Sequence, residues 1–155
     1  MPTYTCTAAS GLLDAQRKGA IARAVTLAHC EITGAPAHFA QVIFTDVAEG
    51  DHFVGGAPLA HDHVFVHGRI RAGRSAGIRE TLIRRLAADV AAAAGVDAFS
   101  VWVYLLELPA EAMIEFGHVL PEAGEEPAWS ESLPVDDWAR MQEIGSLLGP
   151  DRESR

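Results

Sequence analysis

The second residue is the first candidate for chemistry, because the chain opens Met1-Pro2-Thr3. Removal of Met1 would leave Pro2 with a secondary amine that can take or give a proton, and a small residue after the initiator methionine favours that removal. An ordinary α-amino group titrates at about 7.7–8.0. Pro2 is therefore a candidate general acid or base, although these first residues are equally compatible with an ordinary chain start.

Two arginines form the second candidate. Arg71 and Arg74 bracket Gly73, between a predicted strand and a predicted helix start. The first turn of a helix attracts anions through its unpaired N–H groups and its dipole, and guanidinium groups suit a carboxylate. The pair predicts a site for a small anion; the alternative is two solvated surface side chains.

Three further polar residues could complete such a site. His29 ends the first predicted helix, Tyr104 lies in the last predicted strand, and Glu115 stands between apolar residues in the segment 113–117. Burial among apolar groups raises the pKa of a carboxyl unless a cation compensates. Each residue alone is compatible with a structural role, so the hypothesis of catalysis depends on their coming together.

Metal and thiol chemistry are poorly supported by the sequence. His61, His63 and His67 would share one face of a strand, but their spacing matches no zinc signature. Cys30 follows His29 directly, and adjacent helix positions point apart. We therefore expect no metal and no organic cofactor.

Composition narrows the class of protein. The 155 residues, 49% of them hydrophobic, predict one domain over 1–155 with a substantial core. A net charge of −9 argues against nucleic-acid binding, yet six of the twelve basic residues fall within 69–85 and indicate a small anionic ligand. Two unpaired cysteines and the lack of a signal-like or membrane-length apolar segment predict a cytoplasmic protein.

Two stretches of the chain repeat one pattern of elements. The first is predicted as strand 3–8, a helix from Asp14 to about Ile32 closed by Gly34, and strand 39–47. The second is predicted as strand 63–69, a helix from Ser75 to Ala94 closed by Gly95, and strand 100–108. Arg79, Arg84 and Arg85 are expected on the solvated face of the second helix.

The repeat predicts an α/β (α+β) fold built from duplicated β-α-β units, with pseudo-repeats at about 2–60 and 61–120. Right-handed crossovers would place both helices on one face of a four-stranded sheet, so the other face needs a cover and predicts oligomerisation. A loop is expected at 50–58. A hairpin or extended arm at 113–119, a loop at 121–126 and a helix at 135–148 are expected to follow, within a C-terminal extension at 121–155 that ends in a frayed tail at 149–155.

Several segments together resemble one known family. They are Ala28-His29, Ile32-Thr33-Gly34, Ala40-Gln41-Val42, Phe65-Val66-His67-Gly68, Gly73-Arg74-Ser75-Ala76, Val101-Trp102-Val103-Tyr104 and Glu115-Phe116-Gly117. With Pro2 they span the chain to about Trp138 and resemble the tautomerase superfamily, specifically its cis-3-chloroacrylic acid dehalogenase group.

The resemblance implies a homotrimer with Pro2 at the active site. It implies that Arg71 and Arg74, helped by His29, bind the substrate carboxylate. Glu115 and Tyr104 would activate water for addition at C3 of a cis-3-haloacrylate, and Pro2 would protonate C2, so that halide loss gives malonate semialdehyde.

Two other readings stay open. Two parts of the chain differ from the family pattern. One is the segment 34–39, and the other is Phe116, which stands where the pattern has a tyrosine. The same groups could serve enol–keto tautomerisation of a substrate such as phenylenolpyruvate, with Pro2 as base. A third reading is a non-catalytic trimeric binding protein on the same fold.

Overall fold

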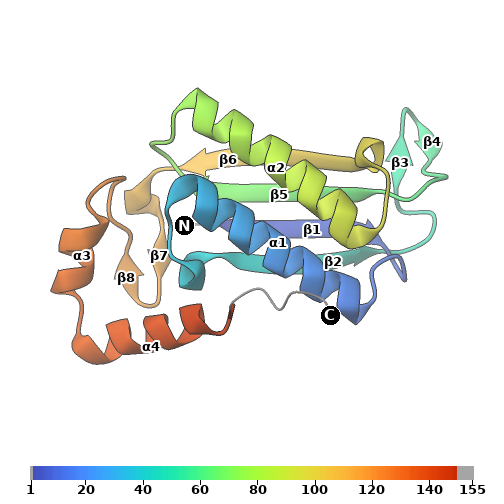
Figure 1. The fold of residues 1–155 in the computed structure, drawn as a ribbon. Coiled ribbons are helices and arrows are strands. Elements are labelled where there is room, and N and C mark those ends of the chain that lie inside the picture. Colours follow the sequence, from blue (N-terminus) through green and yellow to red (C-terminus); the bar gives the residue numbers. More distant parts are fainter. Residues whose placement is uncertain (1, 150–155) are drawn as a thin grey trace.

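Four strands form one mixed sheet, and two long helices cross one of its faces (Figure 1). The structure is a computed structural model that describes residues 2–149, so Met1 and most of the predicted frayed tail lie outside the described residues. The strands are β1 (Thr3–Ala9), β2 (Gln41–Val47), β5 (Val64–Arg71) and β6 (Val101–Leu108), in the order β2-β1-β5-β6. Within each β-α-β unit the two strands are parallel, and β1 runs antiparallel to β5.

The two long helices begin and end with similar capping residues. Helix α1 (Ala15–Thr33) begins after Asp14, whose side chain accepts from the Arg17 amide at 2.8 Å. Helix α2 (Ala76–Ala94) begins after Ser75, whose hydroxyl accepts from the Ile78 amide at 3.3 Å. Each helix ends at a glycine in the left-handed conformation, whose backbone N–H donates a hydrogen bond to a carbonyl group of the last turn. The predicted starts and stops of both helices are confirmed to within one residue.

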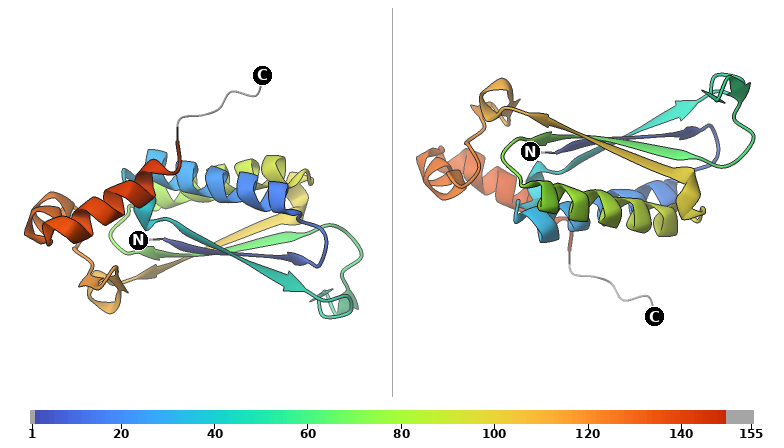
Figure 2. Two further views of the ribbon diagram at one scale, coloured as in Figure 1. Left: turned by 90° about the horizontal axis from the view of Figure 1, so that it is seen from below. Right: turned by 90° about the horizontal axis from the view of Figure 1, so that it is seen from above.

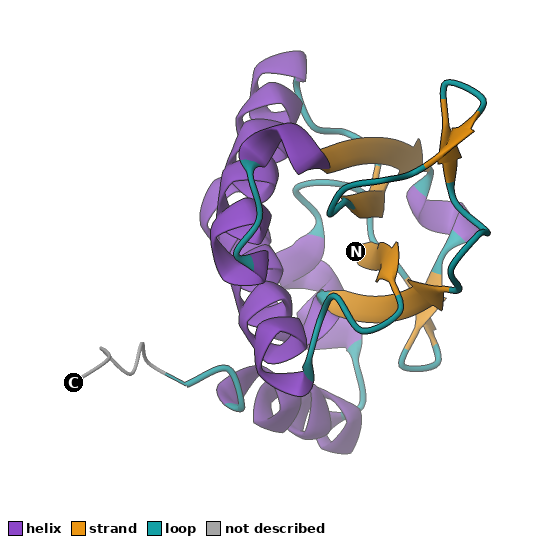
Figure 3. Cartoon of the chain, turned by 90° about the vertical axis from the view of Figure 1, so that its right-hand side faces the viewer, coloured by secondary structure: helices purple, strands orange, loops and turns teal. Residues whose placement is uncertain are grey.

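The core lies between the helices and one face of the sheet. Alternate β1 residues Tyr4, Cys6 and Ala8 face the helices and are buried, as the period of a strand requires. The other face is open (Figure 3), and on the edge strand β6 the outward residues Trp102, Tyr104 and Leu106 remain 43%, 56% and 49% exposed. This open apolar face is the one predicted to need a cover.

Three strands start later than predicted, β2 by two residues and β5 and β6 by one residue each. Short 3-10 turns, η1 (Ala37–Phe39) and η2 (Ala98–Ser100), precede β2 and β6, so Phe39 and Ser100 belong to turns. Asp97 caps the second turn by accepting from the Phe99 amide at 2.8 Å. Apolar content alone does not distinguish such turns from the first residues of a strand. Strand β5, by contrast, extends two residues beyond its predicted end, to Arg71.

Two small hairpins project from the sheet. The region predicted as a glycine-rich loop contains β3 (Phe53–Val54) and β4 (Ala57–Pro58), joined by two glycines with positive φ. The predicted hairpin at 113–119 is confirmed as β7 (Ile114–Glu115) and β8 (His118–Val119), after the turn η3 (Ala110–Ala112). Its turn residue Phe116 has φ 52°, the one non-glycine positive φ among the described residues.

The chain finishes with two helices beside the sheet end at which β1 begins and β5 and β6 finish (Figures 1 and 2). Helix α4 (Val135–Ser146) packs on η1, with the rings of His38 and Trp138 5.7 Å apart. Helix α3 (Glu126–Ser132) is a seven-residue helix that the sequence pattern does not predict. No helix in the described range is long and apolar enough to span a membrane.

Candidate active site

His29 is held in the core by a residue that the sequence analysis did not select. The Tyr4 hydroxyl lies 2.8 Å from His29 Nδ1, and both side chains are buried. Burial, followed by the positive charges of Arg74 and other nearby cations, lowers the pKa of His29 to about 3. Burial also raises the pKa of Tyr4. His29 is therefore a neutral hydrogen-bonding group at ordinary pH.

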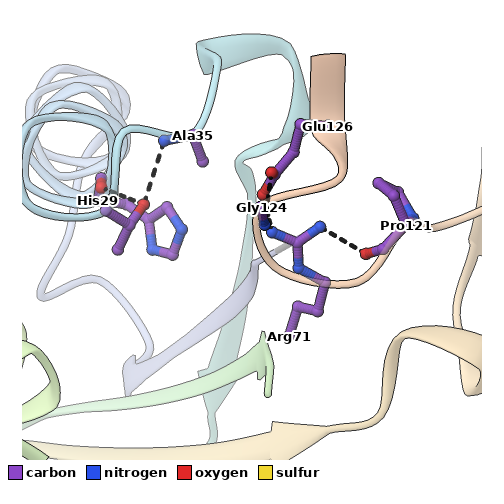
Figure 4. Close-up of polar contacts among 7 residues, drawn as sticks. His29, Ala35, Arg71, Pro121, Gly124 and Glu126 are labelled. Atoms are coloured by element: carbon purple, nitrogen blue, oxygen red, sulfur yellow. Dashed lines mark hydrogen bonds and ion pairs between the residues drawn. The ribbon is translucent and has the colours of Figure 1, made fainter. Parts of the chain in front are cut away.

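Arg71 ends β5 and is 5% exposed. Its Nη1 donates to the Pro121 carbonyl at 2.6 Å, and its Nη2 forms an ion pair with Glu126 Oε1 (Figure 4). A buried guanidinium needs such partners, because an unpaired buried charge is strongly destabilising. Both terminal nitrogens of Arg71 are thus already engaged within the protein.

Arg74 differs from Arg71 in its surroundings. It is half-buried, directly before the N-cap of α2, and its guanidinium has no ion-pair or hydrogen-bond partner within residues 2–149. Burial, and then the charge of Arg71, lower the pKa of Arg74, against the opposing effect of Glu126 and Glu107. A group that stays charged without a partner at a helix start is suited to an external carboxylate.

The backbone beside Arg74 is fixed by Arg79, which the sequence analysis placed on the solvated face. Arg79 Nη1 donates to the Arg74 carbonyl at 2.5 Å and pairs with Glu107 Oε2 at 2.9 Å. Arg84 and Arg85 instead make exposed pairs with acidic residues of the helices. Arg79 differs from them because β6 brings Glu107 within its reach, although its side chain remains 37% exposed.

Pro2 lies at the same end of the sheet. Its ring is fully buried, and its carbonyl accepts from the Gln41 amide at 3.0 Å. Thr3 pairs with Arg69 in the antiparallel register, so Pro2 is level with Ile70, next to Arg71. A small cavity of about 10 Å³ there is lined by His29, Ala35, Ile70, Arg71 and Arg74.

Glu115 faces a second, larger cavity near the start of β1. This cavity has a volume of about 660 Å³, and Thr3, His38, Phe39, Gln41 and Phe116 also line it. Burial raises the pKa of Glu115, while nearby positive charge, including that of Arg71, acts in the opposite direction. Glu115 and His29 thus line different cavities, although the charge of Arg71 acts on both.

Tyr104 is the predicted site residue that the protomer does not bring to the others. It lies on the open face, four residues before the β6 residue that pairs with Arg71, which is about 13 Å along a strand. Its ring contacts Phe65 and lines a separate cavity with His63 and Trp102.

The histidines and cysteines are arranged for neither metal binding nor thiol chemistry. Among residues 2–149, no three His, Cys, Asp or Glu side chains are grouped so that they could hold a metal ion. His63 is buried against the rings of His52 and Trp102. Both cysteines are unpaired thiols, and burial raises the pKa of each, which disfavours the nucleophilic thiolate.

Comparisons with known proteins identify the family of the chain. Residues 1–132 match a family described as putative oxalocrotonate tautomerase enzyme. The structure is similar to that of N1, a member of the cis-3-chloroacrylic acid dehalogenase family, with 35% sequence identity and a TM-score of 0.88. The similarity covers 91% of this chain and 99% of the N1 chain. It is also similar to native Ps01740, at 30% identity, 73% and 99% coverage and a TM-score of 0.68.

A third similar structure is a symmetric trimer, the Q0 fused 4-OT, at 26% identity, 72% and 89% coverage and a TM-score of 0.66. No protein among curated sequences matches this chain. The fold and the site define a tautomerase-type α/β protein. The chain belongs to the tautomerase superfamily, in the group of cis-3-chloroacrylic acid dehalogenase relatives.

Proposed function

We propose that the protein is an enzyme that uses the amine of Pro2, after removal of Met1, as general acid or base on small unsaturated or enolic carboxylates. The observation that carries this proposal is the position of buried Pro2, which lies level with Ile70 at the sheet end that carries Arg71. Arg71 and Arg74 supply positive charge at this end, neutral His29 lines the small cavity with them, and Glu115 lines the larger cavity with Thr3.

The proposed reaction is the hydrolytic dehalogenation of cis-3-haloacrylates, with enol–keto tautomerisation as a further activity. Arg74 binds the carboxylate with Arg71 at the wall of the site, and neutral His29 donates a hydrogen bond to it from Nε2 if Tyr4 donates to Nδ1. Glu115 takes a proton from the water that adds at C3, and Pro2 protonates C2. The resulting halohydrin loses halide and a proton to give malonate semialdehyde. Donors fixed at the carboxylate stabilise the negative charge that develops on it.

A primarily tautomerase function is the second candidate, and the larger cavity favours it. A volume of about 660 Å³, with Phe39 and Phe116 among its lining residues, accommodates an aryl group that a three-carbon haloacrylate lacks. In this reaction neutral Pro2 removes the enol proton of a substrate such as phenylenolpyruvate, and the protonated amine then returns a proton to carbon.

We further propose that the active form is a homotrimer. Tyr104 lies too far along β6 to reach Arg71 of its own chain, and it is exposed on the open face of the sheet. Assembly through that face would bury Tyr104, Trp102 and Leu106 and could bring Tyr104 to the site of a neighbouring subunit. The trimeric fused 4-OT neighbour supports this arrangement.

The test is the kcat/KM for cis-3-chloroacrylate and for phenylenolpyruvate on one preparation whose intact mass shows loss of Met1. A preference of orders of magnitude for the haloacrylate supports the dehalogenase, and the reverse supports the tautomerase. Pro2→Ala and Arg74→Ala are each expected to reduce the better activity by at least about 100-fold, within the range of acid–base catalysis. Turnover of Pro2→Ala at the wild-type rate would end the proposal.

Glu115→Gln separates the two reactions. Because only hydration needs an activated water, dehalogenation should fall by about 100-fold or more, while tautomerisation falls by less than about tenfold. Both rates are measured on the same sample, with circular dichroism to check the fold. Equal losses in the two reactions would remove Glu115 from the water-activating role.

A further inference from the structure

The Arg71 guanidinium is enclosed by the segment that leads into α3. Figure 4 shows Glu126 and Gly124 on one side of it and Pro121 on the other. Glu126 pairs with Arg71 through Oε1, and its Oε2 accepts from the Gly124 amide at 2.8 Å. Burial alone would raise the pKa of Glu126, but the hydrogen bonds from Arg71 and from backbone amides lower it below its usual value. Glu126 is thus an ionised, anchored carboxylate.

The same segment also fits against the loop between the two arginines. Gly73 has φ 101°, and a Cβ placed on it would lie 3.0 Å from the Ala123 Cβ. The loop that carries Arg74 and the segment that holds Arg71 are therefore closely packed. Movement of the segment 121–126 would disturb both arginines.

One donor of Arg71 is left for the site. Arg71 Nε is buried and has no hydrogen-bond partner among the described residues, and Arg71 lines the small cavity with His29 and Arg74. A volume of about 10 Å³ is close to the space that a single water-sized group needs. One oxygen of a carboxylate fits such a space.

We propose that Glu126 is a positioning residue for carboxylate binding, which with the Pro121 carbonyl fixes both terminal nitrogens of Arg71 so that its guanidinium forms the wall of the small cavity. The substrate carboxylate then binds to Arg74 against that wall. This inference rests on the proposed function, because it assigns Glu126 to the same site.

Removal of the Glu126 carboxylate has two opposite effects on the binding of a substrate carboxylate. It leaves the charge of Arg71 uncompensated, and it releases Arg71 from its fixed position. Removing the negative charge of Glu126 would strengthen anion binding through space, because it leaves Arg71 uncompensated. Releasing Arg71 from its fixed position would weaken binding, because a mobile guanidinium must be ordered again by the ligand. A weaker affinity is therefore expected from the loss of positioning and not from the loss of charge.

The experiment is calorimetric titration of the Met-trimmed protein with phenylacetate, a monocarboxylate with neither an enol nor an alkene. Glu126→Ala is expected to weaken binding at least tenfold. Glu126→Gln keeps an oxygen acceptor for Arg71, so its affinity for phenylacetate should lie between those of Glu126→Ala and wild type. The control is Glu125→Ala, at the exposed neighbouring position, and its affinity should stay within about twofold of wild type. Binding at or above wild-type affinity by either Glu126 variant would overturn the proposal.

A double-mutant cycle tests whether Glu126 acts through Arg71. In the Arg71→Ala background, Glu126→Ala should cost no more than about a further twofold, since residues that act as one unit are not additive. With phenylenolpyruvate, the KM of Glu126→Ala should rise while kcat stays within about threefold of wild type. A full tenfold loss in the Arg71→Ala background would show an independent, structural effect and reject the positioning role.

Failure of this inference is distinguishable from failure of the proposed function. If wild type turns over a substrate and Glu126→Ala binds phenylacetate with unchanged affinity, the inference is rejected and the proposed function stands. Weakened phenylacetate binding in Glu126→Ala, with no turnover of either substrate by wild type, keeps the inference and rejects the function. Absence of phenylacetate binding by wild type rejects the inference, and absence of turnover of both substrates as well rejects both.

Discussion

At the scale of single residues, the hydrogen bond between Tyr4 and His29 shows how the core supports the site. Tyr4 is fully buried in β1, and its hydroxyl is the one described partner of the His29 ring. Because the surroundings hold the pKa of His29 near 3, the histidine contributes no positive charge at neutral pH. The cationic character of this corner comes from the arginines.

The lowered pKa of His29 predicts a pH dependence of stability. Unfolded His29 takes up a proton near pH 6.5, whereas folded His29 does so only near pH 3. The unfolded state therefore binds more protons between these values, and stability falls as the pH falls from 6.5 toward 3, by up to roughly 5 kcal/mol from this group.

The check is urea unfolding of wild type and His29→Asn at several pH values in that window. The variant should be less stable at pH 7 but should lose less stability on acidification. His61→Asn, at an exposed position, serves as control and should keep the wild-type slope. Parallel curves for wild type and His29→Asn would contradict the assignment.

At the scale of elements, close packing of β1 on β5 fixes the Tyr4 ring. A Cβ on Gly68 of β5 would lie 2.6 Å from Tyr4 Cε1 and 2.7 Å from Leu105 Cδ2. Gly68→Ala should therefore cost about 1–3 kcal/mol of stability through overpacking, and it should raise the KM by displacing Tyr4 from His29. Denaturant unfolding and steady-state kinetics measure the two effects.

Gly77→Ala is the matched control for Gly68→Ala. Gly77 lies in the first turn of α2, and a Cβ there meets no atom within 4 Å. This substitution should stabilise the protein by about 0.5–1 kcal/mol, because alanine loses less backbone entropy than glycine in a helix. A Gly68→Ala variant as stable as wild type would show that the Tyr4 ring can shift without cost.

The elements that follow a periodic pattern were the ones that sequence could predict. Both long helices carry caps and apolar stripes, and the four sheet strands carry runs of β-branched and aromatic residues, so their order and approximate bounds are confirmed. Helix α3 was missed because its seven residues are too few for a periodic stripe and the preceding Pro/Gly/Glu-rich segment indicates a loop. Pro127 fits the first turn of that helix, where its missing N–H costs nothing.

The sequence predicted the residue types of the candidate site better than the hydrogen bonds and ion pairs among them. Residue types and the family pattern selected Pro2, His29, Arg71 and Arg74; the last three line one small cavity, at the end of the sheet where Pro2 also lies. Tyr4 and Glu126 were not selected, because their partners lie 25 and 55 residues away in sequence and no local spacing reports such contacts. A buried tyrosine in a strand is ordinary until the fold shows what its hydroxyl reaches.

At the scale of the whole molecule, the open face of the sheet is the surface to test for assembly. Leu106→Glu places a charge on this face, at a side chain that is half exposed in the protomer. If three copies pack through the face, the buried charge should dissociate the trimer at micromolar concentrations. Sedimentation equilibrium measures the mass, with Val135→Glu on exposed α4 as control. A wild-type monomer, or an undisturbed trimer in Leu106→Glu, would contradict assembly through this face.

The repeat of the two β-α-β units has a consequence for how many reaction centres the chain can hold. Helices α1 and α2 begin at Ala15 and Ala76, an offset of 61 residues, and the same offset relates Pro2 to His63. Within this chain the nitrogen of His63 is an amide, so only the first unit can offer a basic amine. The two units therefore supply different groups to one end of the sheet, and the second unit contributes Arg71 and Arg74.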